Sequence, residues 1–163
     1  MSSIEQHAAL YNALERSQRA FEGVRAGAAS CGQHGVAAFA WWEAEERREY
    51  ASQVAHHVEG HGGSVVPAAL PAPHVNFDSI SEMIDTVSMY DDKVLAAIEV
   101  LLESIMNAGE DPYFIIGLKK KLKRDMEETE SAQKMFSGVT EENMVEANRM
   151  LLEKYSCTGC SCR

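Results

Sequence analysis

The chain has 163 residues, enough for a single domain that buries its own hydrophobic core. Its 25 acidic and 15 basic residues give a net charge of −10, which argues against a nucleic-acid partner. The apolar runs are all far shorter than a membrane-spanning helix, so we also expect no membrane partner.

The two ends of the chain add little that specifies chemistry. Residues 1–7 lack the basic region and apolar stretch of a secretory signal, so we expect an intracellular, cytoplasmic protein. Cys31 stands alone, whereas Cys157, Cys160 and Cys162 crowd into the last seven residues, which is not a disulfide framework. The triplet could bind a soft metal or form disulfides between subunits, but three thiols make an incomplete tetrahedral site. We interpret residues 157–163 as a flexible, cysteine-rich tail.

Apolar residues recur at helical spacing through five stretches of the chain. A capping box from Ser79 to Glu82 begins the third stretch. The acidic residues Glu141 and Glu142 suit the start of the fifth, because the N-terminal end of a helix dipole is positive. The predicted helices span, in chain order, about residues 4–31, 35–62, 79–105, 112–136 and 141–155.

The connection between the second and third helices is unusually long. Residues 62–78, about 17 in number, reach ~55 Å when extended, whereas a helix of about 28 residues is ~42 Å long. This connection can therefore travel the length of the bundle and leave the second and third helices parallel. A four-helix bundle with one long crossover is the ferritin-like arrangement. We predict an all-α bundle of this kind with a short fifth helix.

Over residues 4–155 the chain resembles the ferritin family. The resemblance rests on residues 39–63, on the proline-containing crossover, on Asp111-Pro112 and on the short fifth helix. The chain is similar to bacterial-type ferritins overall, and residues 44–49 are similar to light-type subunits, which carry a basic residue in place of a catalytic glutamate. The resemblance implies a ferritin-like domain over residues 1–156. It also implies a homo-oligomeric cage of about 24 subunits, or a cage mixed with a catalytically active sibling subunit.

The same resemblance implies that the di-iron oxidation centre is degraded. Leu14, beside Glu15, takes the position of the first-helix glutamate, and Phe21 takes that of a nearby tyrosine. The bridging glutamate and the histidine of the second helix fall on Arg47 and Tyr50. The third-helix glutamate falls on Asp91, or on Asp92 if the alignment shifts by one residue, and the fourth-helix ligand region falls on residues 124–126.

An arginine at this position changes the chemistry of the centre. Ferrous iron prefers carboxylate and imidazole ligands, and a guanidinium has no lone pair to offer it. Arg47 and Tyr50 share one helix face because they are three residues apart. If that face points inward, the buried charge needs a partner. We predict an ion pair between Arg47 and Asp91, with Tyr50 hydrogen-bonded to it, as a pseudo-centre in place of the metals.

Two sets of carboxylates remain candidates for iron. Glu45, Glu46 and Glu49 cluster on the second helix, and the last two match cavity-facing carboxylates of light-type ferritins, so they are candidates for ferric mineral nucleation. The alternative is an ordinary solvated acidic face. A residual, displaced iron site would use Glu15, Glu46, Asp91 and Glu127.

Other features indicate less. His56, His57 and His61 are read as a polar helix end in preference to a metal site, and Met89 alone does not indicate a haem. The basic run at residues 119–124 is typical of a solvated or subunit-contact face. Ile116 and Lys119 fall where animal ferritins have acidic channel residues, which puts that iron entry route in doubt.

The expected function is iron storage and mineralisation with little or no ferroxidase activity, with iron as the cargo and no haem. A ferroxidase with a displaced iron site is the alternative within the family. A scaffold or interaction bundle that binds no metal is the alternative from another class.

Overall fold

The computed structural model describes residues 3–159, with side chains through residue 156. These residues form the helices α1 (Ser3–Ser30), α2 (His34–Gly60), α3 (Ile80–Ala108), α4 (Tyr113–Phe136) and α5 (Glu141–Gly159). The all-α prediction is confirmed, although α5 continues past Tyr155 to Gly159. The side chains of Cys157, Cys160 and Cys162 lie outside the described residues. Within residues 3–159, none of the helices combines the length and apolarity that crossing a membrane requires.

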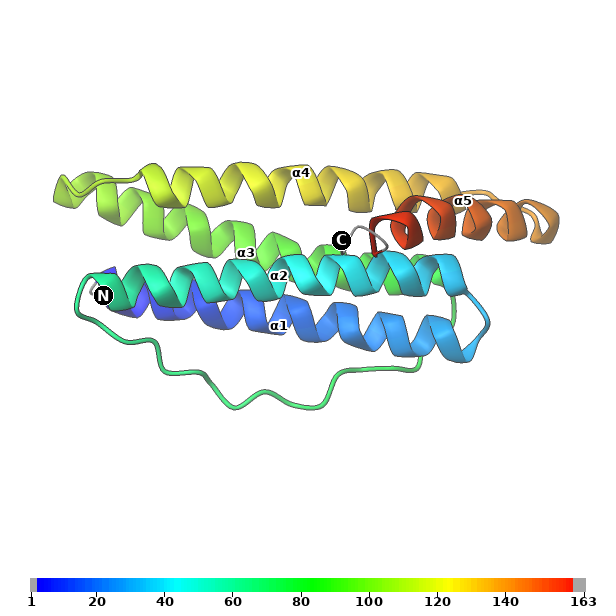
Figure 1. Ribbon diagram of the computed structural model, residues 1–163, viewed down its shortest axis with the longest axis horizontal. Coiled ribbons are helices and arrows are strands. Elements are labelled where there is room, and N and C mark those ends of the chain that lie inside the picture. The colour runs from blue at the N-terminus through cyan, green and yellow to red at the C-terminus, as the bar shows by residue number, and fades with distance from the viewer. Residues whose placement is uncertain (1–2, 160–163) are drawn as a thin grey trace.

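The helices are arranged as two antiparallel pairs joined by the long crossover. Figure 1 shows α1 beside α2 and α3 beside α4, with the non-helical crossover running along the bundle from the end of α2 to the start of α3. The second and third helices are therefore parallel, as the sequence predicted. The fifth helix folds back from the end of α4 and packs against α2.

Glycines of α1 allow the crossover to lie directly on the bundle. A Cβ added at Gly23 would lie 2.1 Å from the carbonyl oxygen of His74, and one at Gly27 would lie 2.6 Å from that of Val75. Both distances are far below van der Waals contact, so a larger residue would lift the crossover away. Its path is thus fixed by close backbone packing as well as by length.

Side-chain and backbone caps set the ends of α3. The hydroxyl of Ser79 accepts a hydrogen bond from the N–H of Glu82 at 3.0 Å, as the predicted capping box requires. The Glu82 carboxylate accepts from the N–H of Asp78 at 2.5 Å, one residue before the usual position. At the other end, Gly109 has φ 68°, a left-handed conformation that favours glycine and closes the helix.

Two apolar clusters make up the core. One contains Phe21, Phe39 and Ile84 and is completed by Leu151 and Tyr155 from α5. The other contains Leu10, Leu14, Tyr50, Ile98 and Leu122. A layer of buried polar side chains belongs to neither cluster, and Arg47 is the largest of them.

Candidate functional site

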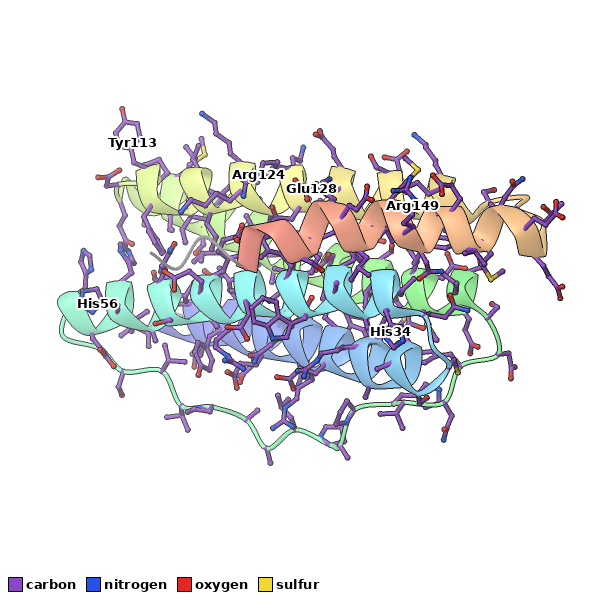
Figure 2. All side chains as sticks on the ribbon, turned by 45° about the vertical axis from the view of Figure 1, so that its right-hand side comes forward. His34, His56, Tyr113, Arg124, Glu128 and Arg149 are labelled. Carbon is purple, nitrogen blue, oxygen red and sulfur yellow. The ribbon has the colours of Figure 1, made fainter. Side chains whose placement is uncertain are left out.

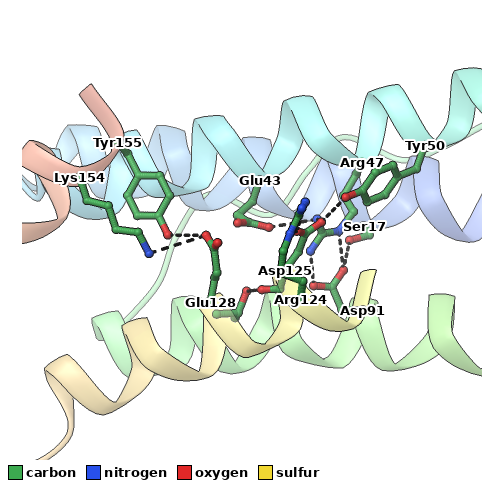
Figure 3. Close-up of polar contacts among 11 residues, drawn as sticks. Ser17, Glu43, Arg47, Tyr50, Asp91, Arg124, Asp125, Glu128, Lys154 and Tyr155 are labelled. Carbon is green, nitrogen blue, oxygen red and sulfur yellow. Dashed lines mark hydrogen bonds and ion pairs between the residues drawn. The ribbon is translucent and has the colours of Figure 1, made fainter. Parts of the chain in front are cut away.

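Arg47 lies at the centre of this buried polar layer and is 0% exposed. Its Nη2 donates to Asp91 Oδ2 at 2.6 Å, and its Nε donates to Asp91 Oδ1 at 2.9 Å, as Figure 3 shows. These two bonds form the bidentate fork that gives an arginine–carboxylate pair its strength. The predicted contact between Arg47 and Asp91 is therefore present, and it joins α2 to α3.

Two further carboxyl groups approach the same guanidinium. Arg47 Nη1 lies 3.3 Å from Asp125 Oδ2 on α4 and 3.0 Å from Glu43 Oε2 on its own helix. Burial alone disfavours the charged guanidinium, but the attraction of Asp91, Glu43 and Asp125 outweighs it and raises the pKa of Arg47 further above its ordinary value. Carboxyl groups from three helices thus converge on one permanent cation.

Hydroxyl groups donate further hydrogen bonds to carboxylate oxygens that Arg47 already contacts. Ser17 donates to Asp91 Oδ1 at 2.7 Å, and Tyr50 donates to Asp125 Oδ2 at 2.5 Å. The predicted hydrogen bond from Tyr50 therefore goes to the α4 carboxylate and not to Asp91. Burial, followed by this bond to Asp125, raises the pKa of Tyr50, which keeps its proton. The Phe21 ring lies 5.0 Å from the guanidinium carbon and covers it from the α1 side.

Glu43 differs from the two aspartates in its protonation. Burial raises the pKa of its carboxyl to about 8, because Arg47 only partly offsets the desolvation and the carboxylates of Asp125 and Asp91 repel a further negative charge. Its Oε2, although 3.0 Å from Arg47, accepts no hydrogen bond of good geometry. At neutral pH Glu43 therefore carries a proton. The Arg124 guanidinium, 3.1 Å from Asp125 Oδ1 at the exposed rim, supplies a second cation for the two aspartates.

This arrangement does not fit a resident di-iron centre. The guanidinium fills the space between the carboxyl groups of α2, α3 and α4, and Tyr50 rather than an imidazole contacts Asp125. Within residues 3–159, no group of three or more His, Cys, Asp and Glu side chains could hold a metal ion. The buried centre is therefore organised around a built-in organic cation.

The three glutamates predicted to nucleate mineral, Glu45, Glu46 and Glu49, have different neighbours. Glu45 pairs with Arg48 at 3.1 Å. Glu46 is half-buried, and its charge acts on Tyr50 and on Arg124 of α4. Glu49 is exposed and accepts a hydrogen bond from Gln53 at 2.9 Å. Only Glu46 thus lies close to the buried centre.

The residues proposed for a displaced iron site are only partly brought together. Asp91 and Glu127 line a cavity of about 240 Å³ between α3 and α4. Glu15 lies on α1 beside Tyr11 and does not line that cavity. Asp91 is already engaged by Arg47 and Ser17.

A second polar group joins α5 to the same region. Tyr155 donates to Glu128 on α4 at 3.0 Å, and Lys154 lies 3.8 Å from the same carboxylate. Figure 2 places Glu128 and Arg124 along α4 near α5, and Figure 3 shows the Tyr155 contact beside Glu43. The Tyr155 hydroxyl thereby closes the centre on the side away from Tyr50.

Comparison with known proteins identifies the fold. The chain is similar to a humanized archaeal ferritin, with 15% identity, a TM-score of 0.85 and coverage of 93% of this chain and 95% of that chain. It is similar to an open-pore ferritin from the archaeon Archaeoglobus fulgidus, with 17% identity, a TM-score of 0.86 and coverage of 91% and 94%. A closed form of that ferritin, made by site-directed mutagenesis, gives 16% identity, a TM-score of 0.84 and coverage of 93% and 96%.

At these identities the similarity defines a class of fold, a ferritin-like bundle, over almost the full length of both chains. No protein-family model matches the sequence. No curated protein matches it either.

Proposed function

We propose that this chain is a ferritin-like cage subunit that holds iron mineral without an oxidation centre of its own. The observation that carries the proposal is the position of Arg47, buried between carboxyl groups of three helices within a ferritin-like bundle. A guanidinium cannot ligate iron and repels incoming cations. Iron is then cargo, oxidised in solution or by a sibling subunit and deposited on surface carboxylates.

Oxygen consumption after addition of ferrous iron tests the missing oxidase directly. The expected rate equals that of a protein-free control at the same pH, because the chain offers no site that holds two ferrous ions together. Rapid oxygen uptake saturating at a fixed number of iron atoms per chain would contradict the proposal. It would favour the displaced site, for which the shared cavity of Asp91 and Glu127 is the supporting observation.

A second experiment asks whether Arg47 is what keeps metal out. Arg47→Glu combined with Tyr50→His supplies the carboxylate and imidazole that the family motif has at these positions. We expect this double variant to bind ferrous or cobaltous ions that the native chain does not, measured by calorimetry. Arg48→Glu with Gln53→His is the control, because it introduces the same two side chains on the same helix but away from the buried centre and without a shared face. No additional binding by the Arg47 variant would refute the pseudo-centre.

The storage part of the proposal assigns mineral nucleation to Glu45, Glu46 and Glu49. Clustered carboxylates collect ferric ions through hard oxygen ligands and need no redox geometry. Replacing all three with Gln should slow mineral growth from added ferric citrate, followed by light scattering and by iron retained per chain. Glu141→Gln with Glu142→Gln, exposed acidic residues at the start of α5, should leave it unchanged.

The native mass separates storage from a scaffold that binds no iron. The proposed assembly is the 24-subunit cage that the ferritin resemblance implies, alone or mixed with an active subunit. A small oligomer that retains no iron after loading would favour the scaffold function.

A further inference from the structure

A cavity of about 680 Å³ opens at the end of the bundle where α1 begins, α2 ends and α3 turns into α4. Its volume lies within the range of small-molecule sites in proteins. Apolar side chains from all four helices form its walls: Ile4, Val58, Ile105 and Phe114. It is remote from the Arg47 centre and plays no part in the proposed function.

His7 presents a buried acceptor to this cavity. The residue is 6% exposed, and its Nδ1 lies 2.7 Å from the backbone carbonyl oxygen of Ser3. Because a carbonyl can only accept, Nδ1 carries a proton, and in the neutral ring Nε2 then keeps a free lone pair. This Nε2 is buried and has no hydrogen-bond partner among the described residues. A buried polar atom without a partner is costly, so a ligand that donates to it is favoured.

Two neighbouring histidines, His57 and His61, also line the cavity. His61 Nδ1 donates to the carbonyl oxygen of His57 at 2.8 Å, which again leaves Nε2 as the acceptor. The His57 ring stacks on Phe114 at 4.2 Å and lies 5.6 Å from the His7 ring. Burial, together with His61 and His7, lowers the pKa of His57 against the opposing effect of Asp111, so this ring is neutral at pH 7.

The rim of the cavity adds negative charge. Glu110 and Asp111 line it, and no lysine or arginine does. Since no three-ligand group for a metal ion forms within residues 3–159, the acceptors suit a cation that brings its own hydrogen-bond donors. The apolar walls suit a cation with an apolar body.

We propose that this cavity binds a small organic ammonium ion with an aromatic or apolar body. The ammonium group donates to His7 Nε2 and is attracted by Glu110 and Asp111. Its apolar body packs against Ile105 and Phe114, where the aromatic face also favours a cation.

Three aromatic probes of similar size and different charge test this proposal. Benzylammonium, benzyl alcohol and benzoate are titrated into the full chain at about pH 8 by calorimetry. We expect benzylammonium to bind at least about tenfold more tightly than benzyl alcohol and benzoate not to bind. Equal affinity for all three, or preference for benzoate, would overturn the charge assignment whatever the variants show.

Substitution of the acceptor tests its location. His7→Phe keeps a planar ring but removes Nε2, and we expect it to weaken benzylammonium binding about tenfold. His56→Phe is the matched control, because His56 is exposed near the end of α2 and does not line the cavity (Figure 2). In the native chain, the ¹⁵N shift of His7 Nε2 should move on titration. An unmoved signal with unchanged affinity in His7→Phe would place the ligand elsewhere.

The pH dependence provides an independent readout. The titratable groups that face the cavity are His7 from α1, His57 from α2, His61 just after α2, and Glu110 and Asp111 between α3 and α4. A doubly protonated imidazole offers no acceptor and carries positive charge, so we expect weaker benzylammonium binding at about pH 5.5 than at about pH 8. Affinity that is constant across this range would contradict the role of the histidines.

Discussion

Arg47 shows how a single buried residue can balance the charge of several carboxyl groups. Its guanidinium donates two hydrogen bonds to Asp91 and also contacts Asp125 and Glu43. A buried ion network is costly to assemble, but removal of one member is costlier still, because its partners stay buried without compensation. The carboxyl groups of this bundle therefore depend on Arg47 as those of a metal centre depend on the metal.

Replacement of Arg47 with Met removes this charge and approximately keeps the side-chain volume. We expect a loss of about 3–5 kcal/mol in the free energy of unfolding, because Asp91 would be left as a buried carboxylate without a cation and Asp125 would keep only Arg124 at the rim. Arg48→Met is the control, since the Arg48 side chain is 57% exposed and pairs only at the surface. It should stay within about 0.5 kcal/mol of the native chain. Urea unfolding of both variants gives the comparison, and equal losses would show that the buried network does not stabilise the fold.

Glu43 predicts a specific dependence of stability on pH. Its carboxyl holds a proton up to pH about 8 in the folded chain, compared with an ordinary pKa of 4.5. Because the folded state binds this extra proton, Glu43 makes the free energy of unfolding fall as the pH rises from about 4.5 to about 8. Glu43→Gln removes this contribution. The free energy of unfolding of the variant, relative to that of the native chain, should therefore increase as the pH rises through that range.

Unfolding midpoints at intervals from about pH 5 to about pH 9 measure the effect. Glu49→Gln, an exposed residue on the same helix, should follow the native profile. If the unfolding midpoint of Glu43→Gln has the same pH dependence as that of the native chain, Glu43 does not carry the proton in the folded state.

At the scale of the elements, α5 is a built-in part of the bundle. The start of α2 has no side-chain cap of its own. Asn148 of α5 supplies one, because its Oδ1 accepts from the N–H of Val36 at 3.3 Å. The Tyr155 ring packs edge-on against Phe39 at 5.3 Å, and its hydroxyl reaches Glu128 on α4. The fifth helix therefore caps α2 and closes the core between α2 and α4.

Two glycines in helices give a matched test of this docking. A Cβ at Gly35 would lie 2.0 Å from the backbone oxygen of Asn148, whereas one at Gly117 in α4 meets nothing within 4 Å. Gly35→Ala should push α5 off α2 and cost about 1–3 kcal/mol. Gly117→Ala should stabilise the chain by about 0.5–1 kcal/mol through helix propensity. Thermal unfolding measures the stability of both variants. In Gly35→Ala, amide exchange in α5 should also be faster than in the native chain. Stabilisation by both substitutions would contradict close packing of α5.

The sequence predicted the helices and the crossover because those features follow from local periodicity, glycines and prolines. It also predicted the contact of Arg47 with Asp91, since one buried cation on an apolar stripe needs an anion on another. Glu43 was missed, although it lies four residues before Arg47 on the same face, a spacing that joins neighbours on a helix. For α4 the resemblance indicates only residues 124–126, although Asp125 continues the buried stripe of Leu118 and Leu122.

Other parts of the molecule carry no local signal. The cavity of His7, His57 and His61 forms where the start of α1 meets the end of α2. The short connection brings these two ends together, but nothing near His7 in the sequence indicates that the three side chains face one cavity. The capping of α2 by Asn148 likewise joins residues more than a hundred positions apart. Contacts of this kind depend on how the helices pack, which periodicity alone does not determine.

At the scale of the whole molecule, the proposed cage would bury apolar side chains that the single chain exposes. Met106 is 67% exposed and Tyr113 is 79% exposed, on either side of the turn from α3 to α4. Assembly would remove large apolar side chains as exposed as these from water. A charge placed among them should therefore weaken assembly without unfolding the bundle.

We predict that Met106→Lys shifts the native mass from the assembled state toward the single chain, because a lysine ammonium at a subunit contact loses its hydration without gaining a partner. Asn107→Lys is the control, since it adds the same charge at an adjacent, exposed position of α3 that is already polar. Light scattering on line with size exclusion gives the mass, and circular dichroism should show unchanged helix content in both variants. If both lysines, or neither, disrupt assembly, this surface is not the contact between subunits.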